Sequence, residues 1–532
     1  MTEPVESGAT RWSAWSDRRC WLAIGAALFV LAAWPLLLVE LPPLQDLPNH
    51  VASAYIVHHL DRYPDLVFNG FWKSNSLLAR WLDLWPDRDL LCGARIFVAI
   101  VLAANAFGLP WFVLQVAGRR AMITASLVIW PLVHGFFLSM GMMNFAIGLP
   151  LALVVLVALD RQRTRPSVAR AIAIIALGFA SWYVHPFPLI VVGGLAVLAW
   201  LEARRRGADG SSVRAGVIML LPLVPVAALV VGTALQHLVK AEGAPVAAGL
   251  DVVLPASWEV PLDLWLHASG ALTRWGSVTV FAAIALPILA WRRAAPPILG
   301  RWATFALVAG YAGLPLMISN WWYLNARLVP FVWVALAVRM PPRVPRWLTA
   351  ALVGAALWFS VVLGVDYVRL DRDRAELTAG IAAVPEHATL LPLLFSHRKT
   401  SDFTASLTHA WAYYVMAKQT SAPLVFAVER SYPITYRVFP PAALIPPALD
   451  GFAERHATPA AACASRDDLG RSPADCAAAW QLAWSQLWRL AEPRFTHVLT
   501  WAMPPEARAI LPPSYHLAFS AGDLAIYARE PR

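Results

Sequence analysis

The side chains best suited to chemistry lie in a short polar segment after the first apolar run. Residues 41–50 read Leu-Pro-Pro-Leu-Gln-Asp-Leu-Pro-Asn-His and place the carboxylate of Asp46 near Asn49 and His50. Three prolines restrict φ and remove backbone donors, so we expect the segment to leave the preceding helix and form a polar turn. A carboxylate held on such a turn could act as a general base. The alternative is a helix-exit turn with a solvated Asp46.

Five further polar residues lie at the ends of other apolar runs. Each alone has a structural explanation. For example, Asn144 could cap the helix after the turn at 139–143, His185 could bond a backbone carbonyl freed by Pro188, and Arg327 could reach lipid headgroups. The expected topology nevertheless brings all five to the same membrane face as Asp46. We therefore predict that they bind substrate together with Asn49 and His50: Asn144, His185, Tyr323, Asn325 and Arg327.

The elements that position these residues are predicted to be membrane spans. The 532-residue chain is 59% hydrophobic and 14% charged, a composition typical of polytopic membrane proteins. The first apolar run, residues 21–39, is long enough to span and lacks a small-residue cleavage site, so it should remain as a signal anchor.

The net charge of +10 follows the expected topology. Lys and Arg are concentrated in alternate loops, and the positive-inside rule places these loops and the N-terminus in the cytoplasm. Because the excess charge is explained in this way, no nucleic-acid partner is expected.

The chain divides into three parts on this basis. We predict a cytoplasmic tail (1–20), a helical membrane domain (21–365) of about eleven spans, and an extracytoplasmic α/β domain (366–532). Outer loops are expected at 41–90 and 237–275, and a helix break at 183–188. In the last domain, 389–394 and 495–501 are predicted strands, 515–528 a hairpin and 406–417 a helix. A disulfide between Cys463 and Cys476 is expected outside the cytoplasm.

With these residues in place, the chain resembles the GT-C superfamily of membrane glycosyltransferases. The resemblance rests on Gln45-Asp46-Leu47-Pro48-Asn49-His50, the Asn-Ala-Arg-Leu-Val-Pro run at 325–330, the topology and the C-terminal domain. It is similar to bacterial members with Asp-Leu-Pro-Asn-His after the first span. The resemblance implies an inner-membrane enzyme that transfers a sugar from a polyprenyl-phosphate donor to an extracytoplasmic glycan, lipid or protein.

The implied reaction is an inverting displacement. Asp46 would be the base for the acceptor hydroxyl, and Arg327 would hold the departing phosphate. Many relatives carry an acidic pair in the first loop, whereas Gln45 precedes Asp46 here, so the need for a divalent metal ion is left open.

Two other classes of function remain open from the sequence. A transporter or lipid flippase is expected to have repeated halves and polar helices near the bilayer midplane, whereas here the polar residues lie at one surface. A non-catalytic membrane protein of envelope assembly would need only the architecture.

Overall fold

The computed structural model describes most of the chain. The described residues are 16–238, 252–254, 262, 265–266, 277–291, 297–318, 321–400, 404–428, 431–464 and 472–530. Most of the predicted cytoplasmic tail and of the second outer loop, 237–275, therefore lies outside the described residues.

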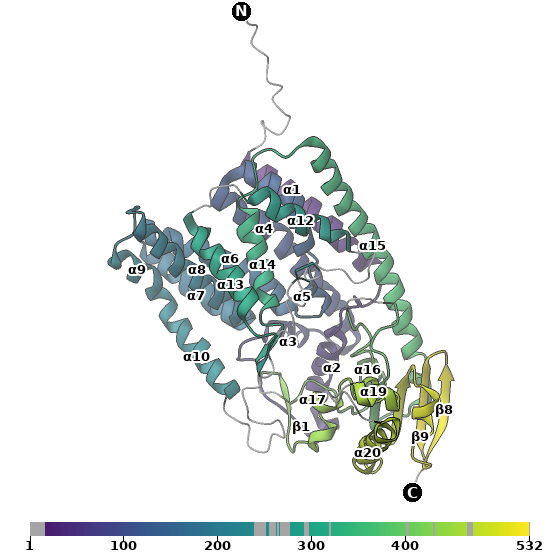
Figure 1. Ribbon diagram of the computed structural model, residues 1–532. Helices are drawn as coiled ribbons and strands as arrows, with labels where there is room; N and C mark the ends of the chain where they lie inside the picture. Colours follow the sequence, from purple (N-terminus) through teal and green to yellow (C-terminus); the bar gives the residue numbers. More distant parts are fainter. Residues whose placement is uncertain are drawn as a thin grey trace, which may run out of the picture.

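Within this part of the chain, six helical segments are long and apolar enough to cross a membrane, as expected for a membrane protein. They are built from α1 (Asp17–Ala33), α4 (Leu90–Ile129), α6 (Met143–Thr164), α8 (Pro186–Arg205), α9 (Val213–Leu220) with α10 (Val224–Leu238), and α15 (Arg346–Thr378). Shorter apolar helices pack among them (Figure 1): α7 (Val168–Val184), α12 (Thr279–Ala290), α13 (Arg301–Gly313) and α14 (Val329–Ala337).

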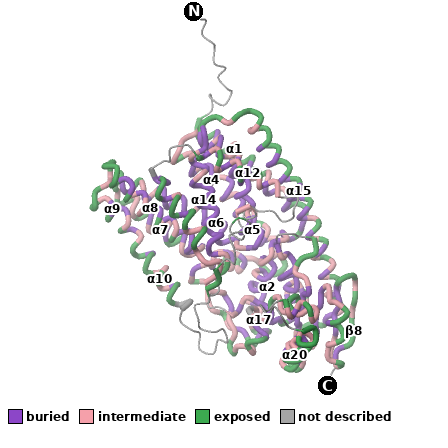
Figure 2. The backbone as a smooth tube through the Cα atoms, viewed as in Figure 1, coloured by how far each residue is buried: buried purple, intermediate pink, exposed green. Residues whose placement is uncertain are grey.

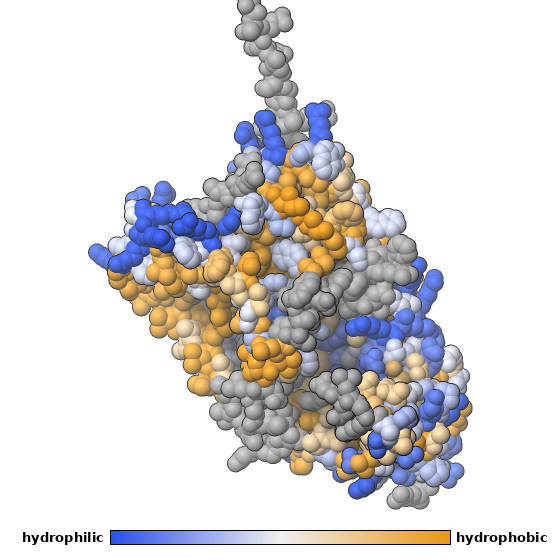
Figure 3. Space-filling view, viewed as in Figure 1, coloured by the Kyte–Doolittle hydropathy of each residue, from blue (hydrophilic) through white to orange (hydrophobic). Residues whose placement is uncertain are grey.

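The outward faces of these helices are apolar. On α15, for example, the exposed side chains include Val353, Leu357 and Val361, which share one helical face. In the space-filling view, hydrophobic residues cover much of the helical part, and hydrophilic residues gather at its upper end and around the C-terminal domain (Figure 3). Buried residues fill the centre of the molecule (Figure 2). The exposed apolar face is the one expected of helices that meet lipid.

Two of the helical segments are interrupted. Gly118, with φ +83°, kinks α4. His185 separates α7 from α8 because its backbone is extended and Pro186 opens the next helix. The second break lies where the sequence predicts one.

Residues 41–90, the predicted first outer loop, are folded against the C-terminal part of the chain. They contain α2 (Leu47–His58), β1 (Leu66–Phe68) and α3 (Leu77–Leu82). Strand β1 pairs antiparallel with β6 (Ile434–Tyr436), and α2 packs against α16 (Ala412–Lys418). The residues after the first span and those after the last span thus form one structure.

The C-terminal part contains a four-stranded sheet of order β5-β7-β9-β8. Strand β5 (Leu390–Leu394) runs parallel to β7 (His497–Trp501), and β8 (Tyr515–Ala521) forms a hairpin with β9 (Leu524–Arg529). Strand β5 lies at the sheet edge, where its Pro392 removes no central ladder bond.

Other elements complete this part of the chain. Helix α20 (Pro473–Ala491) begins with a capping box from Ser472 and Asp475. Cys476 in this helix forms a disulfide with Cys463, with Cα atoms 5.4 Å apart. These are the two cysteines for which the sequence predicts a bridge.

Two boundaries differ from the sequence-based expectation. Helix α15 continues past 365 to Thr378, so the last span and the C-terminal part share one helix. The helix expected over 406–417 begins only at Ala412. Residues 405–412 instead form successive turns, in which the amide of Thr408 bonds Ala405 and that of Ala412 bonds His409. This irregular segment faces Asp46.

Candidate active site

Asp46 lies in a tight turn between the first span and α2. Proline at position 48 is tolerated in the first turn of α2, where its missing N–H has no helical partner. The amide of Gln45 donates to the Ser139 carbonyl (3.0 Å) and that of Asp46 to the Met140 carbonyl (3.3 Å). The turn is therefore held against the short segment that precedes α6.

The close approach of these two segments requires a glycine. Gly141 has φ +84°, and a Cβ added there would lie 2.7 Å from the Asp46 nitrogen and 2.8 Å from the Asp46 Cβ. Both the backbone conformation and the space favour glycine at this position.

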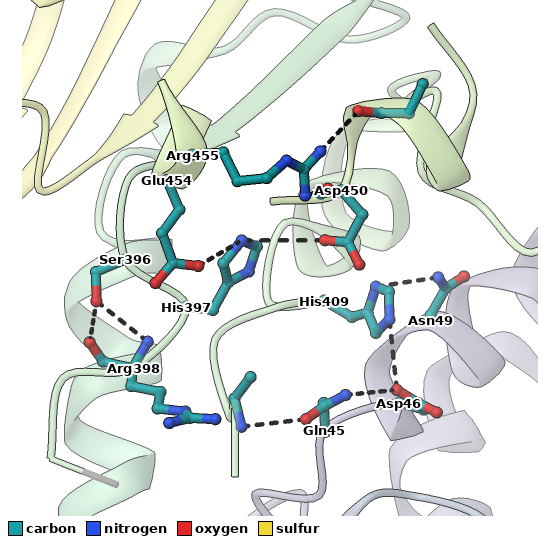
Figure 4. A network of polar contacts seen from close by, with 12 residues as sticks. Gln45, Asp46, Asn49, Ser396, His397, Arg398, His409, Asp450, Glu454 and Arg455 are labelled. Atoms are coloured by element: carbon teal, nitrogen blue, oxygen red, sulfur yellow. Dashed lines mark hydrogen bonds and ion pairs between the residues drawn. The ribbon is translucent and has the colours of Figure 1, made fainter. Parts of the chain in front are cut away.

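The C-terminal domain contacts the carboxylate through His409 (Figure 4). His409 Nε2 lies 3.4 Å from Asp46 Oδ1, and Gln45 Nε2 donates to the same oxygen at 3.4 Å. Gln45 is itself fixed, because its Oε1 accepts from the Ala405 amide (3.1 Å). Asp46 is thus held from its own loop and from a segment about 360 residues away in sequence.

Asn49 ties α2 to the C-terminal domain. Its side chain is fully buried. Oδ1 accepts from the Phe426 amide (3.2 Å), and Nδ2 lies 3.0 Å from the Leu424 carbonyl oxygen and 3.2 Å from His409 Nδ1. In this structure Asn49 therefore positions protein groups around Asp46.

His50 packs its ring against Phe426, with centroids 5.2 Å apart. Burial lowers the pKa of His50 to about 4, although the nearby Asp46 charge opposes the shift and His409 adds to it. At neutral pH His50 is therefore an uncharged neighbour of the carboxylate.

A second polar cluster lies at the break between α7 and α8. Arg327 is 8% exposed, and its guanidinium carbon lies 5.5 Å from the centroid of the Phe145 ring. Its Nε and Nη2 donate to the Trp322 carbonyl (3.3 and 3.2 Å), and Nη1 lies 3.0 Å from His185 Nε2.

His185 receives a second donor, because the Phe187 amide lies 3.2 Å from its Nδ1. A neutral imidazole has one acceptor nitrogen. His185 can therefore satisfy either the Phe187 amide or Arg327 Nη1, but not both at once.

Tyr323 and Asn325 precede this arginine. Tyr323 has φ +57° and contacts Phe136 with ring centroids 5.4 Å apart. Burial raises the pKa of its phenol; the charge of Arg398 lowers it and that of Asp46 raises it further. Tyr323 thus lies within electrostatic reach of Asp46. Asn325 caps the turn Ala326–Leu328 through a hydrogen bond to the Ala326 amide (2.8 Å).

Asn144 is engaged elsewhere. Its Oδ1 accepts from the Leu78 amide (3.1 Å), and its Nδ2 donates to the backbone and side-chain oxygens of Asn75 (2.8 and 3.0 Å). The structure uses Asn144 to anchor the start of α3 and does not bring it to the Asp46 carboxylate. Asn144 does not cap α6, the helix that follows the turn at 139–143, because that helix has no side-chain cap.

The described residues around Asp46 do not supply a complete set of protein ligands for a divalent metal ion. No group of three or more His, Cys, Asp or Glu side chains among them is arranged to hold a metal ion. Gln45 stands where an acidic pair would supply a second carboxylate, and its amide donates to Asp46. Such a donor fits a hydrogen-bonded carboxylate better than a metal-bound one.

His409 is the site residue that the sequence did not reveal. It lies in a region expected to be helical and belongs to no recognisable motif. The pairing of β1 with β6 and the packing of α2 on α16, with the bonds of Gln45 and Asn49 to residues 405–426, bring it to Asp46. No protein-family model matches the chain, and no curated protein matches it.

Proposed function

We propose that the chain is a GT-C-type glycosyltransferase that moves a sugar from a polyprenyl phosphate to an extracytoplasmic acceptor. The observation that carries the proposal is the Asp46 carboxylate. It is held on a proline turn after the first span and is contacted by His409 of the C-terminal domain. A carboxylate fixed at the junction of a membrane part and a polar part can act on a lipid-linked donor and a water-soluble acceptor.

The proposed reaction needs one base and one cation. The acceptor oxygen attacks the anomeric carbon as the bond from that carbon to the phosphate oxygen breaks. Asp46 takes the hydroxyl proton, and the polyprenyl phosphate leaves with the bonding pair. A single displacement inverts the anomeric configuration and needs no protein nucleophile.

Arg327 is proposed to bind the phosphate. It is a buried cation close to the break between α7 and α8, and its Nη1 shares His185 with the Phe187 amide. A phosphate oxygen could accept the hydrogen bond from Nη1, and His185 would then accept only from the Phe187 amide. Guanidinium groups suit such anions because their donors lie in one plane.

The orientation is part of the proposal. We propose about eleven crossings, with α4 counted twice around Gly118 and α9 and α10 counted together. From a cytoplasmic N-terminus, an odd number places Asp46 and the C-terminal domain outside the bacterial inner membrane.

A deletion strain tests the function. Its lipids should contain an accumulated polyprenyl-phosphate sugar, and its envelope should contain a glycan, lipid or protein that lacks that sugar. Purified protein should then transfer the radiolabelled sugar from this lipid to the truncated acceptor. Accumulation of the lipid in the cytoplasmic leaflet, without transfer by the purified protein, would indicate a flippase and overturn the proposal.

A further inference from the structure

His409 is placed to control the geometry of the Asp46 carboxylate. Its side chain is 11% exposed, and its Nε2 and Nδ1 contact Asp46 and Asn49 respectively. The ring also packs edge-on against Phe426, with centroids 5.1 Å apart. Three contacts from different directions therefore hold the imidazole.

The hydrogen bonds of Asn49 determine which nitrogen of His409 carries the hydrogen. Because Asn49 Oδ1 accepts from the Phe426 amide and Nδ2 donates to the Leu424 carbonyl, the amide cannot be flipped without losing both bonds. Nδ2 therefore also donates to His409 Nδ1, which must be the acceptor. The remaining hydrogen of the neutral ring lies on Nε2 and faces Asp46.

We propose that His409, delivered by the C-terminal domain, is a positioning residue for Asp46 in the transfer reaction. This inference rests on the proposed function. His409 Nε2 and Gln45 Nε2 both contact Oδ1, so Oδ2 is the oxygen directed to the acceptor hydroxyl. His409 is not the base itself, because Nδ1 is occupied by the Asn49 amide and Nε2 already carries a hydrogen.

This arrangement makes the base depend on docking of the C-terminal domain. Asp46 belongs to the first outer loop, whereas His409 and the backbone that orients Asn49 belong to residues 405–426. The titratable groups that face His409 are Asp46, His50 and His397, and Asp46 is the one that it contacts directly.

The test compares His409→Leu, which removes the donor, with His409→Gln, whose amide restores one. His516→Leu, on the exposed surface of β8, is the control. Carbodiimide labels protonated carboxyl groups, so the pH at which Asp46 loses labelling can be measured by peptide mass spectrometry without any substrate. Asp46→Asn identifies the labelled site.

In His409→Leu, loss of a donor to the carboxylate should move the labelling midpoint upward by about 0.5 to 1 pH unit. His409→Gln and His516→Leu should keep the wild-type midpoint. With the donor lipid from the deletion strain, His409→Leu should lower kcat by about 10- to 100-fold with little change in KM. His409→Gln should have a kcat close to that of the wild type.

An unchanged midpoint in folded His409→Leu would overturn the inference, even if the wild type is an active transferase. If His409→Leu does not fold, a shifted midpoint or low kcat in folded His409→Gln would overturn it instead. An inactive wild type with the expected shift in midpoint would refute the proposed function and leave the contact established.

Discussion

Replacing Gly141 by alanine tests whether the segment before α6 sets the position of Asp46. The new Cβ would lie 2.7 Å from the Asp46 nitrogen and 3.0 Å from its Cα, which are backbone atoms that cannot turn away. The turn must shift by several tenths of an ångström or the site must bear the strain. Overpacking of this kind costs about 1 to 3 kcal/mol.

Gly70→Ala is the matched control. Gly70 lies in the same segment, 41–90, as Asp46 and has a similar φ of +79°, but no described atom lies within 4 Å of an added Cβ. Both variants lose about 1 to 2 kcal/mol because alanine disfavours the left-handed region. Only Gly141→Ala should carry the further overpacking cost, and a displaced carboxylate should lower turnover by up to about 100-fold.

The assay is thermal unfolding in detergent together with transfer from the accumulated donor lipid. Gly141→Ala should unfold at a lower temperature than Gly70→Ala and should lose activity that Gly70→Ala keeps. Equal stability and equal turnover of the two variants would refute the reasoning that this contact positions Asp46.

Three further predictions concern other groups. His50 has a pKa of about 4 in the folded protein and an ordinary value of 6.5, so the unfolded state takes up a proton first as the pH falls. The free energy of unfolding should therefore be intact above pH 6.5 and decrease by up to about 3 kcal/mol towards pH 4. If the unfolding temperature of His50→Gln falls with pH as steeply as that of wild type, this prediction is contradicted. Arg327→Lys keeps the charge but not the planar donors, so transfer should fall by about 100-fold, and full transfer would reduce Arg327 to a structural cation. Replacing Cys463 and Cys476 by serine should cost about 3 kcal/mol, since the bridge closes a loop of 13 positions, and an unchanged unfolding temperature would show that the bridge adds no stability.

The features that were predictable from the sequence depend on local constraints. Pro48 near Asp46 and Pro186 after His185 lie in the first turns of α2 and α8, and long apolar runs become helices with apolar outer faces. The edge position of β5 follows from Pro392. These properties are set by the residues themselves and their near neighbours.

The features that were missed depend on contacts between distant segments. His409 lies on successive turns that are held by two bonds to distant residues: the Ala405 amide donates to Gln45, and the Leu407 amide donates to the His397 carbonyl. The helix or strand propensity of residues 405–412 cannot predict such bonds. Asn144 has the polarity of a site residue, yet it bonds the backbone of the α3 region. Polarity at a helix end therefore indicated where polar contacts form, but did not distinguish a substrate contact from a protein contact.

The most direct test of the central claim is the turnover of purified Asp46→Asn beside wild type. The assay uses the polyprenyl-phosphate sugar that accumulates in the deletion strain and the truncated acceptor from its envelope. The amide keeps the size of the carboxylate and removes its basicity, so transfer should fall by about 10² to 10⁴-fold, while thermal unfolding and donor binding stay near wild type. Unchanged transfer by folded Asp46→Asn would contradict the assignment of Asp46 as the general base.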